Sequence, residues 1–148
     1  MGTQRLLIFT DGGARGNPGP AAIGFVVKDE RGKILAQKGK FLGRATNNVA
    51  EYQALIEALK WLIANNANGL IFTKEKKLIV NFFLDSQLVV NQLNGFYKIK
   101  DIKLKNLIIK VKSLEKKING KIFYGFVHRQ KNRQADFLVN QTLDNQGY

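Results

Sequence analysis

The chain has 148 residues, of which 45% are hydrophobic, so length and composition favour a folded domain over a disordered segment. It contains no cysteine, which excludes a disulfide scaffold and a thiolate zinc site. Lysine and arginine number 24 against 11 acidic residues, and the net charge of +13 favours a polyanionic partner such as a nucleic acid. A lysine-rich surface that only maintains solubility is the alternative explanation of this charge.

The sequence carries no repeat, no low-complexity tract and no Pro/Ser-rich linker, which predicts one domain over residues 1–148. The apolar run at residues 6–9 is too short for a signal peptide or a membrane span. We therefore expect a soluble, cytoplasmic protein without a membrane partner. Nothing in the sequence indicates an obligate protein partner, so a monomer is expected.

The first third of the chain alternates short apolar runs with turn residues, as strands do. Strands are predicted at residues 5–10, 21–29 and 33–42. A loop rich in glycine and proline, residues 12–20, separates the first two strands. The tripeptide Glu30-Arg31-Gly32 is typical of a hairpin turn between the second and third strands.

Beyond this hairpin the apolar spacing becomes helical, and Thr46, Asn47 and Asn48 are candidate caps for a helix over residues 48–64. Residues 65–76 are predicted to form a loop, and the apolar run 78–84 to form a buried strand. The remaining predicted elements are helices at 86–93 and 102–117, a strand at 121–127 and a helix at 132–143. This order predicts an α/β fold, a mixed sheet with helices packed on it.

Four acidic residues occupy positions that suggest a common site. Asp11 follows the first predicted strand, and Asp85 follows the buried strand. If these strands pair in parallel, both carboxylates emerge at the same edge of the sheet. Glu51 precedes the apolar stripe of its helix by four residues and so faces the sheet, and Asp136 lies at the start of the last helix.

Carboxylates gathered at one place repel one another and take up protons unless cations neutralise them. The chain has no cysteine and a single histidine, so a metal site here would be built from carboxylate oxygens. Oxygen ligands suit Mg²⁺ or Mn²⁺. Two such ions roughly 3.5–4 Å apart form a clamp for attack on a phosphodiester. Each residue also has a structural alternative: Asp11 as a turn residue, Asp85 as a helix cap, Asp136 beside a helix dipole, and Glu51 in a capping box with Asn48.

In chain order, the sequence resembles type 1 ribonuclease H at four motifs. They are IFTDGG with GNPGP at residues 8–13 and 16–20, TNNVAE at 46–51, LDSQLVV at 84–90, and NRQAD at 132–136. The match extends from residue 5 to about residue 143. It implies a ribonuclease H-like α/β fold, with a five-stranded mixed sheet and helices on both faces.

The resemblance also implies an endoribonuclease that hydrolyses the RNA strand of RNA–DNA hybrids and leaves 5′-phosphate and 3′-hydroxyl ends. The family's catalytic, metal-binding carboxylates correspond to Asp11, Glu51, Asp85 and Asp136, which would hold two Mg²⁺ or Mn²⁺ ions when substrate is bound. Either His128 or Arg129 stands where the family carries a mobile histidine that assists product release. The expected substrate-binding residues are Gly12, Gly13, Asn17, Asn47, Asn48 and Asn132, with Arg44, Thr46 and Asn106 at a phosphate of the DNA strand.

The sequence departs from longer family members at three places. The segment 95–100 replaces a basic, Trp-rich protrusion, the loop that carries His128 and Arg129 is shorter than the family's, and residues 65–76 form an insertion without an assigned function. A separate hybrid-binding domain is not expected. Three alternative functions remain open at this point. They are another ribonuclease H-like nuclease such as a transposase core, an actin-like nucleotide phosphatase, and a non-catalytic nucleic-acid-binding module.

Overall fold

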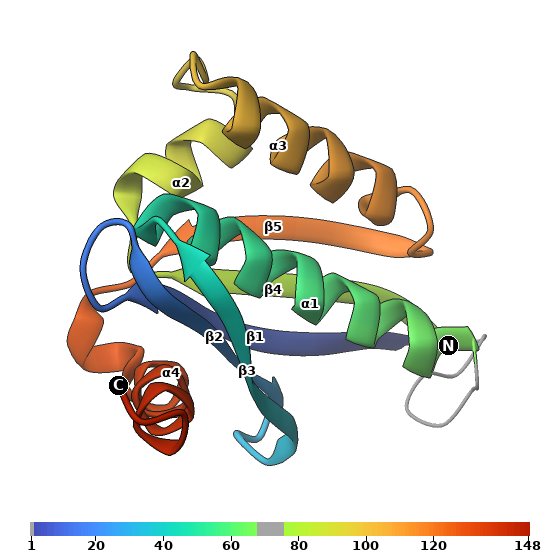
Figure 1. The fold of residues 1–148 in the computed structure, drawn as a ribbon. Coiled ribbons are helices and arrows are strands. Elements are labelled where there is room, and N and C mark those ends of the chain that lie inside the picture. The colour runs from blue at the N-terminus through green and yellow to red at the C-terminus, as the bar shows by residue number, and fades with distance from the viewer. Residues whose placement is uncertain (1, 68–75) are drawn as a thin grey trace.

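Five strands form one mixed sheet, in the order β3-β2-β1-β4-β5, in a computed structural model that describes residues 2–67 and 76–148 (Figure 1). β1 pairs antiparallel with β2 and β2 with β3, whereas β4 lies parallel to both β1 and β5. Parallel neighbours need long crossover connections, and these place helices on the faces of the sheet. The strands are β1 (Gly2–Ala14), β2 (Gly19–Asp29), β3 (Ile34–Ala45), β4 (Lys76–Leu84) and β5 (Gly120–Phe126).

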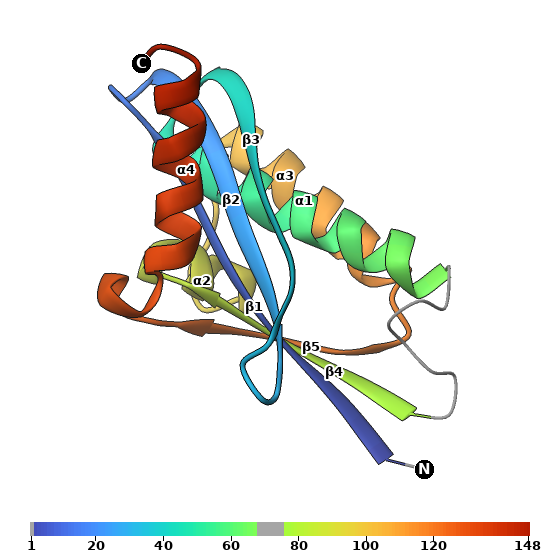
Figure 2. The same ribbon diagram turned by 90° about the horizontal axis from the view of Figure 1, so that it is seen from below.

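Helices cover both faces of this sheet, as the views in Figures 1 and 2 show. One face carries α1 (Asn47–Ala67), α2 (Gln87–Leu93) and α3 (Ile102–Glu115), with α1 packed between the sheet and α3. The other face carries α4 (Arg133–Asn145), which follows a short 3-10 turn at Arg129–Lys131 and packs on β1, β2 and β3. The predicted fold class, a five-stranded mixed sheet with helices on both faces, is confirmed.

The main core lies between the sheet and α1, and its apolar side chains remove the largest area from water. α1 is buried almost all round because α3 covers the side that the sheet leaves open. A smaller cluster fills the opposite face under α4, where Val139 and Leu143 meet Ala22 of β2. The largest fully buried aliphatic side chains on α1 are Leu55, Ile56, Leu59 and Leu62.

Two predicted loops are shorter in the structure than expected. The expected loop at residues 12–20 is shorter, because β1 extends to Ala14 and β2 begins at Gly19. The expected loop at residues 65–76 begins later, because α1 continues to Ala67 and Lys76 already belongs to β4. The rest of that predicted insertion, residues 68–75, lies outside the described residues. Among the described helices, none is both long and apolar enough to cross a membrane.

Candidate active site

Asp11 lies inside β1, just beyond the point where β1 stops pairing with β4. The parallel ladder with β4 ends at the pair Phe9–Phe83, whereas the antiparallel ladder with β2 continues through the pair Asp11–Gly24. The prediction that Asp11 ends its strand is therefore wrong, because β2 supports the strand beyond it. The reasoning about the sheet edge still holds, since Asp11 sits past the carboxyl end of the parallel pair.

Gly12 lets helix α1 approach β1 at the residue that carries the second carboxylate. A Cβ at Gly12 would lie 2.2 Å from the backbone carbon and oxygen of Ala50 and 2.6 Å from the nitrogen of Glu51. Only glycine fits such a contact, so this position brings Glu51 beside Asp11. The capping alternative for Glu51 is unnecessary, because the Val49 amide donates to Thr46 Oγ1 at 3.2 Å.

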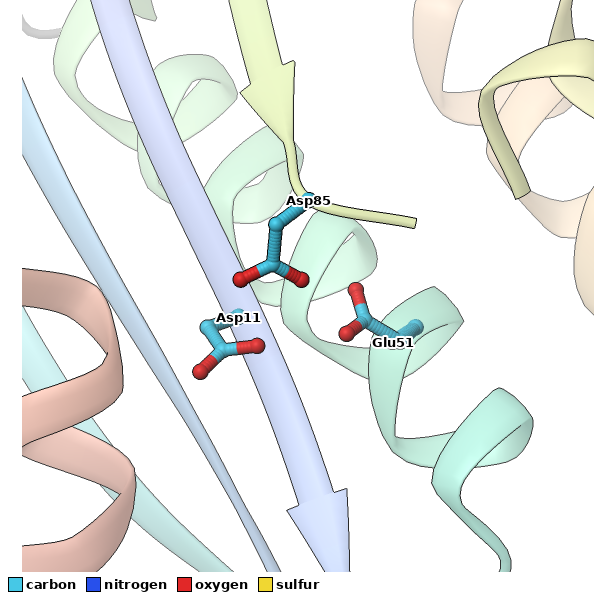
Figure 3. A group of neighbouring side chains, drawn as sticks. All are labelled: Asp11, Glu51 and Asp85. Carbon is cyan, nitrogen blue, oxygen red and sulfur yellow. The ribbon is translucent and has the colours of Figure 1, made fainter. Parts of the chain in front are cut away.

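Asp85 immediately follows β4 and precedes α2. Its neighbour Ser86 caps α2, with Oγ accepting a hydrogen bond from the Val89 amide at 3.2 Å. The capping role that the sequence left open for Asp85 therefore belongs to Ser86. The Asp85 carboxylate is directed toward Asp11 and Glu51 instead (Figure 3).

Asp11, Glu51 and Asp85 each contribute a carboxylate oxygen, and these oxygens lie within 4.8 Å of one another (Figure 3). Asp136 enters from α4 and lines the same cavity. α4 reaches this position because β2 carries Gly24, where a Cβ would lie 2.5 Å from the carbonyl oxygen of the residue before Asp136. Close helix contacts on the two faces of the sheet thus bring the predicted carboxylates to one place.

Burial and mutual repulsion disfavour the charged forms of these groups. Burial, followed by the charges of Asp85 and Asp136, raises the pKa of Asp11 from 3.8 to about 8. Burial, followed by the charges of Asp11 and Asp85, raises the pKa of Glu51 well above its usual value, and the Gly12 amide offsets only part of this. Without a cation, the cluster therefore takes up protons near neutral pH.

The donor set fits a hard divalent cation. Glu51 Oε2 is buried and has no hydrogen-bond partner within residues 2–67 and 76–148. The ion pairs in those two ranges leave the four carboxylates out, since they join Arg15 to Asp144, Lys40 to Glu57 and Lys112 to Glu115. A buried carboxylate oxygen without a protein partner, surrounded by further carboxylates, is what Mg²⁺ or Mn²⁺ ligation requires.

A cavity of about 390 Å³ opens over the carboxylates, and the β1–β2 connection forms part of its wall. Two asparagines tie this connection to the start of α1. The backbone amide of Asn47 donates to Asn17 Oδ1 at 3.0 Å, and the backbone amide of Ala14 donates to Asn47 Oδ1 at 2.8 Å. Gly12, Gly13, Asn47 and Asn48 line the cavity together with the carboxylates.

The other expected site residues differ in their exposure to solvent. Arg44 and Asn106 are exposed, and Thr46 is half-buried as the cap of α1. Arg129 lines the carboxylate cavity, whereas His128 is exposed and packs edge-on against Phe126. Asn132 differs from all of these, because it is only 1% exposed.

Three polar residues of the cavity wall were absent from the predicted site residues: Arg15, Ser86 and Asn140. Ser86 had a usable signal, since it directly follows Asp85 at the start of a predicted helix. Arg15 had none, because its partners lie far along the chain. Its guanidinium donates to Asp144 Oδ1 at 2.7 Å and to the Tyr148 carbonyl oxygen, which fastens the β1–β2 connection to the end of α4.

Comparison with known proteins agrees with this geometry. A family model described as "Reverse transcriptase-like" matches residues 9–142. The bifunctional protein Rv2228c of Mycobacterium tuberculosis is 39% identical over 142 residues, which cover 95% of this chain. The match covers 36% of that relative, so the chain spans about a third of its length.

Two solved structures match along nearly their whole length. One is LC11-RNase H1, from compost, in complex with an RNA/DNA hybrid, with 38% identity, a TM-score of 0.86, and coverage of 97% of this chain and 99% of that one. The other is RNase H1 from Halobacterium salinarum, with 38% identity, a TM-score of 0.83, and coverage of 95% and 98%. The four motifs, the fold and these matches lead to one assignment: the chain belongs to the type 1 ribonuclease H family.

Proposed function

We propose that this chain is a metal-dependent endoribonuclease that hydrolyses the RNA strand of RNA–DNA hybrids, leaving 5′-phosphate and 3′-hydroxyl ends. The observation that carries the proposal is the meeting of Asp11, Glu51 and Asp85 within 4.8 Å, with Asp136 on the same cavity. A structural role does not explain this cluster, since its charges repel one another and have no basic partner in the described part of the chain. Family membership supports the same reaction.

In this proposal Asp11, Glu51, Asp85 and Asp136 hold two Mg²⁺ or Mn²⁺ ions when substrate is bound. Bound divalent cations supply charge stabilisation at the phosphate and an activated water. The protein's own contribution is to fix the carboxylates on rigid elements, so that no rearrangement accompanies the reaction. Burial of Glu51 and Asp11 lowers the local dielectric and strengthens this electrostatic contribution.

Recognition of the RNA strand is assigned to the polar groups around the β1–β2 connection. Asn17 and Asn47 each use Oδ1 as an acceptor toward the backbone. No hydrogen bond within the described ranges uses their side-chain NH₂ groups, so each offers a donor to a 2′-hydroxyl or a base edge. Asn48 and the Gly12–Gly13 backbone line the same cavity.

The DNA strand is assigned to the flank formed by β3, α1 and the start of α3. A second cavity there, of about 400 Å³, is lined by Arg44, Lys60 and Lys103, among others. With Thr46 and the exposed Asn106, Arg44 would hold a phosphate of the DNA strand. The exposed rings of Phe96 and Tyr97, 76% and 52% accessible, lie in the short segment that replaces the basic protrusion and would extend this contact.

The two candidates for assisting product release are not equivalent. Arg129 lines the carboxylate cavity and carries a permanent charge that attracts a phosphate. The His128 ring packs at nearly a right angle against the Phe126 ring, and His128 does not line the cavity. We therefore assign the role to Arg129 in this chain.

The proposal treats residues 1–148 as one catalytic domain that acts as a monomer in the cytoplasm. The continuous core across the sheet and α1 supports a single folding unit. Sedimentation equilibrium of the purified chain tests the oligomeric state, because a dimer would appear at twice the mass of 16.7 kDa.

The test is hydrolysis of end-labelled RNA–DNA hybrid, RNA duplex and single-stranded RNA, each with and without Mg²⁺. We expect Mg²⁺-dependent cleavage of the RNA strand in the hybrid only. Glu51→Gln should abolish it, whereas the matched control Glu30→Gln, which neutralises an exposed turn residue, should leave it unchanged. Hybrid binding without cleavage under every metal condition would instead identify a non-catalytic binding module.

A further inference from the structure

Asn132 lies directly before α4 and is 1% exposed. Its Nδ2 donates to the Thr10 carbonyl oxygen at 2.9 Å and to Asp85 Oδ2 at 3.3 Å. Its Oδ1 is buried and has no partner within residues 2–67 and 76–148. A fully buried side-chain amide whose NH₂ group donates two hydrogen bonds to fixed acceptors is constrained in position and orientation.

An ordinary helix-capping role does not account for this side chain. Asn132 occupies the N-cap position of α4, yet its side chain makes no capping hydrogen bond. Its burial also keeps it away from a substrate in the cavity, in contrast to the exposed Asn17 and the cavity-lining Asn47. The amide group serves two neighbours instead, and both of them adjoin the carboxylate cluster.

The contacts of Asn132 reach three of the segments that carry the carboxylates. Thr10 immediately precedes Asp11 in β1, and Asp85 is itself a member of the cluster. The backbone carbonyl oxygen of Asn132 accepts a hydrogen bond from the backbone amide of Asp136 at 3.1 Å, at the start of α4. One residue therefore joins β1, just past its last pair with β4, and the residue after β4 to the start of α4.

We infer that Asn132 is a positioning residue that sets the spacing of Asp11, Asp85 and Asp136 and orients the Asp85 carboxylate. This inference rests on the proposed function, and it replaces the substrate contact expected for Asn132 from the sequence. An asparagine NH₂ group can only donate, so it fixes the position of the carboxylate oxygen Asp85 Oδ2 that accepts from it. The carboxylate is then held between Asp11 and Glu51, where Figure 3 places it. Such outer contacts to ligating carboxylates typically change metal affinity about 10- to 100-fold when they are removed.

The test is calorimetric titration of the whole chain with Mn²⁺ alone, without nucleic acid. Asn132→Ala should raise the Mn²⁺ Kd about 10- to 100-fold. The control is Gln92→Met, which removes a buried side-chain amide that accepts from the Tyr52 hydroxyl at 2.7 Å, on α2. Gln92→Met should lower the melting temperature but leave the Mn²⁺ Kd within twofold of the original chain. If Asn132→Ala does not fold, Asn132→Ser is measured instead. Serine retains one donor, so its Mn²⁺ Kd should lie between that of the original chain and the value expected for Asn132→Ala.

Steady-state cleavage gives the second measurement. A positioning role predicts a lower kcat for Asn132→Ala with an unchanged KM for the hybrid. An unchanged Mn²⁺ Kd, or a raised KM with normal kcat, would overturn the inference in favour of a purely structural or a substrate-binding role. If the original chain binds Mn²⁺ and Asn132→Ala weakens that binding, while neither cleaves hybrid, the inference stands and the proposed function fails.

Discussion

Replacing Asp11 by asparagine is expected to stabilise the metal-free protein while weakening its metal site. Asn has the shape of a protonated Asp but carries no charge at any pH. In the folded chain Asp11 is 8% exposed, and burial and the charges of Asp85 and Asp136 raise its pKa from 3.8 to about 8. At neutral pH the unfolded chain carries Asp11 ionised, so folding must protonate it at a cost in free energy, and the substitution removes that cost.

The size of the effect follows from the linkage between protonation and folding. From the usual pKa of 3.8 to pH 7 is about 3 pH units, and at about 1.4 kcal/mol per unit the cost of protonating Asp11 on folding at pH 7 has a ceiling of about 4 kcal/mol. Glu51 shares the proton uptake and reduces this cost. We expect Asp11→Asn to gain about 2 kcal/mol, or about 4–8 °C in melting temperature for a chain of this length.

The sign of the pH dependence is equally specific. Because the folded state binds the Asp11 proton more tightly than the unfolded state does, this contribution to stability is complete below pH 3.8 and is lost as pH rises to about 8. The free energy of unfolding of the original chain in EDTA should therefore fall between pH 5.5 and pH 8 more steeply than that of Asp11→Asn. Urea unfolding followed by circular dichroism at both pH values measures the difference.

Saturating Mg²⁺ should reverse the ranking, because an ion that binds only the folded state stabilises it by mass action. The original chain should gain stability with Mg²⁺, and Asp11→Asn should gain little. Equal pH slopes for the two proteins, or a less stable Asp11→Asn in EDTA, would refute the account of a repulsive carboxylate cluster.

Three further predictions concern the approach of α1, a buried hydroxyl and the basic surface. Gly12→Ala should cost at least about 3 kcal/mol in urea unfolding and weaken Mn²⁺ binding, because its Cβ would lie 2.2 Å from the Ala50 backbone; normal stability would contradict the close packing. Tyr124→Phe should cost about 1 kcal/mol, since its hydroxyl donates to Glu115, with activity unchanged; an unaffected melting temperature would show that this bond contributes nothing. Hybrid binding by Asp85→Asn should weaken steeply between 50 and 200 mM salt (roughly 10-fold or more), and a flat titration would contradict phosphate contacts by the basic surface.

Much of the fold was predictable because each element carries a local signal. The apolar run of β4 and the periodic apolar stripe of α1 indicate a buried strand and a buried helix. Asp85 directly follows β4, at the edge where α/β sheets place their sites. The end of β1 was not predictable in this way. Gly12 and Gly13 indicate a turn in isolation, and only their pairing with β2 extends the strand.

The candidate site was predictable at its ligands and less so at its supports. Asp11, Glu51 and Asp85 were identified from their positions after strands and on a helix, and the structure brings them within 4.8 Å. Asn132 was expected to contact substrate, since an asparagine beside a helix start looks accessible in sequence. Its burial depends on the docking of the start of α4 against Thr10 of β1 and against Asp85, which is a long-range property of the fold.

The placement of α4, the one described α-helix on its face of the sheet, has a consequence for biosynthesis. β1, β4 and α1 leave the ribosome first, so a nascent chain presents three acidic side chains before the segment with Asn132 and Asp136 has emerged. Docking of that last helix against the β2 glycine is then the event that completes the centre. Under the proposed function, a nascent chain would therefore gain the ability to cleave hybrid only after α4 has emerged from the ribosome and docked on the sheet.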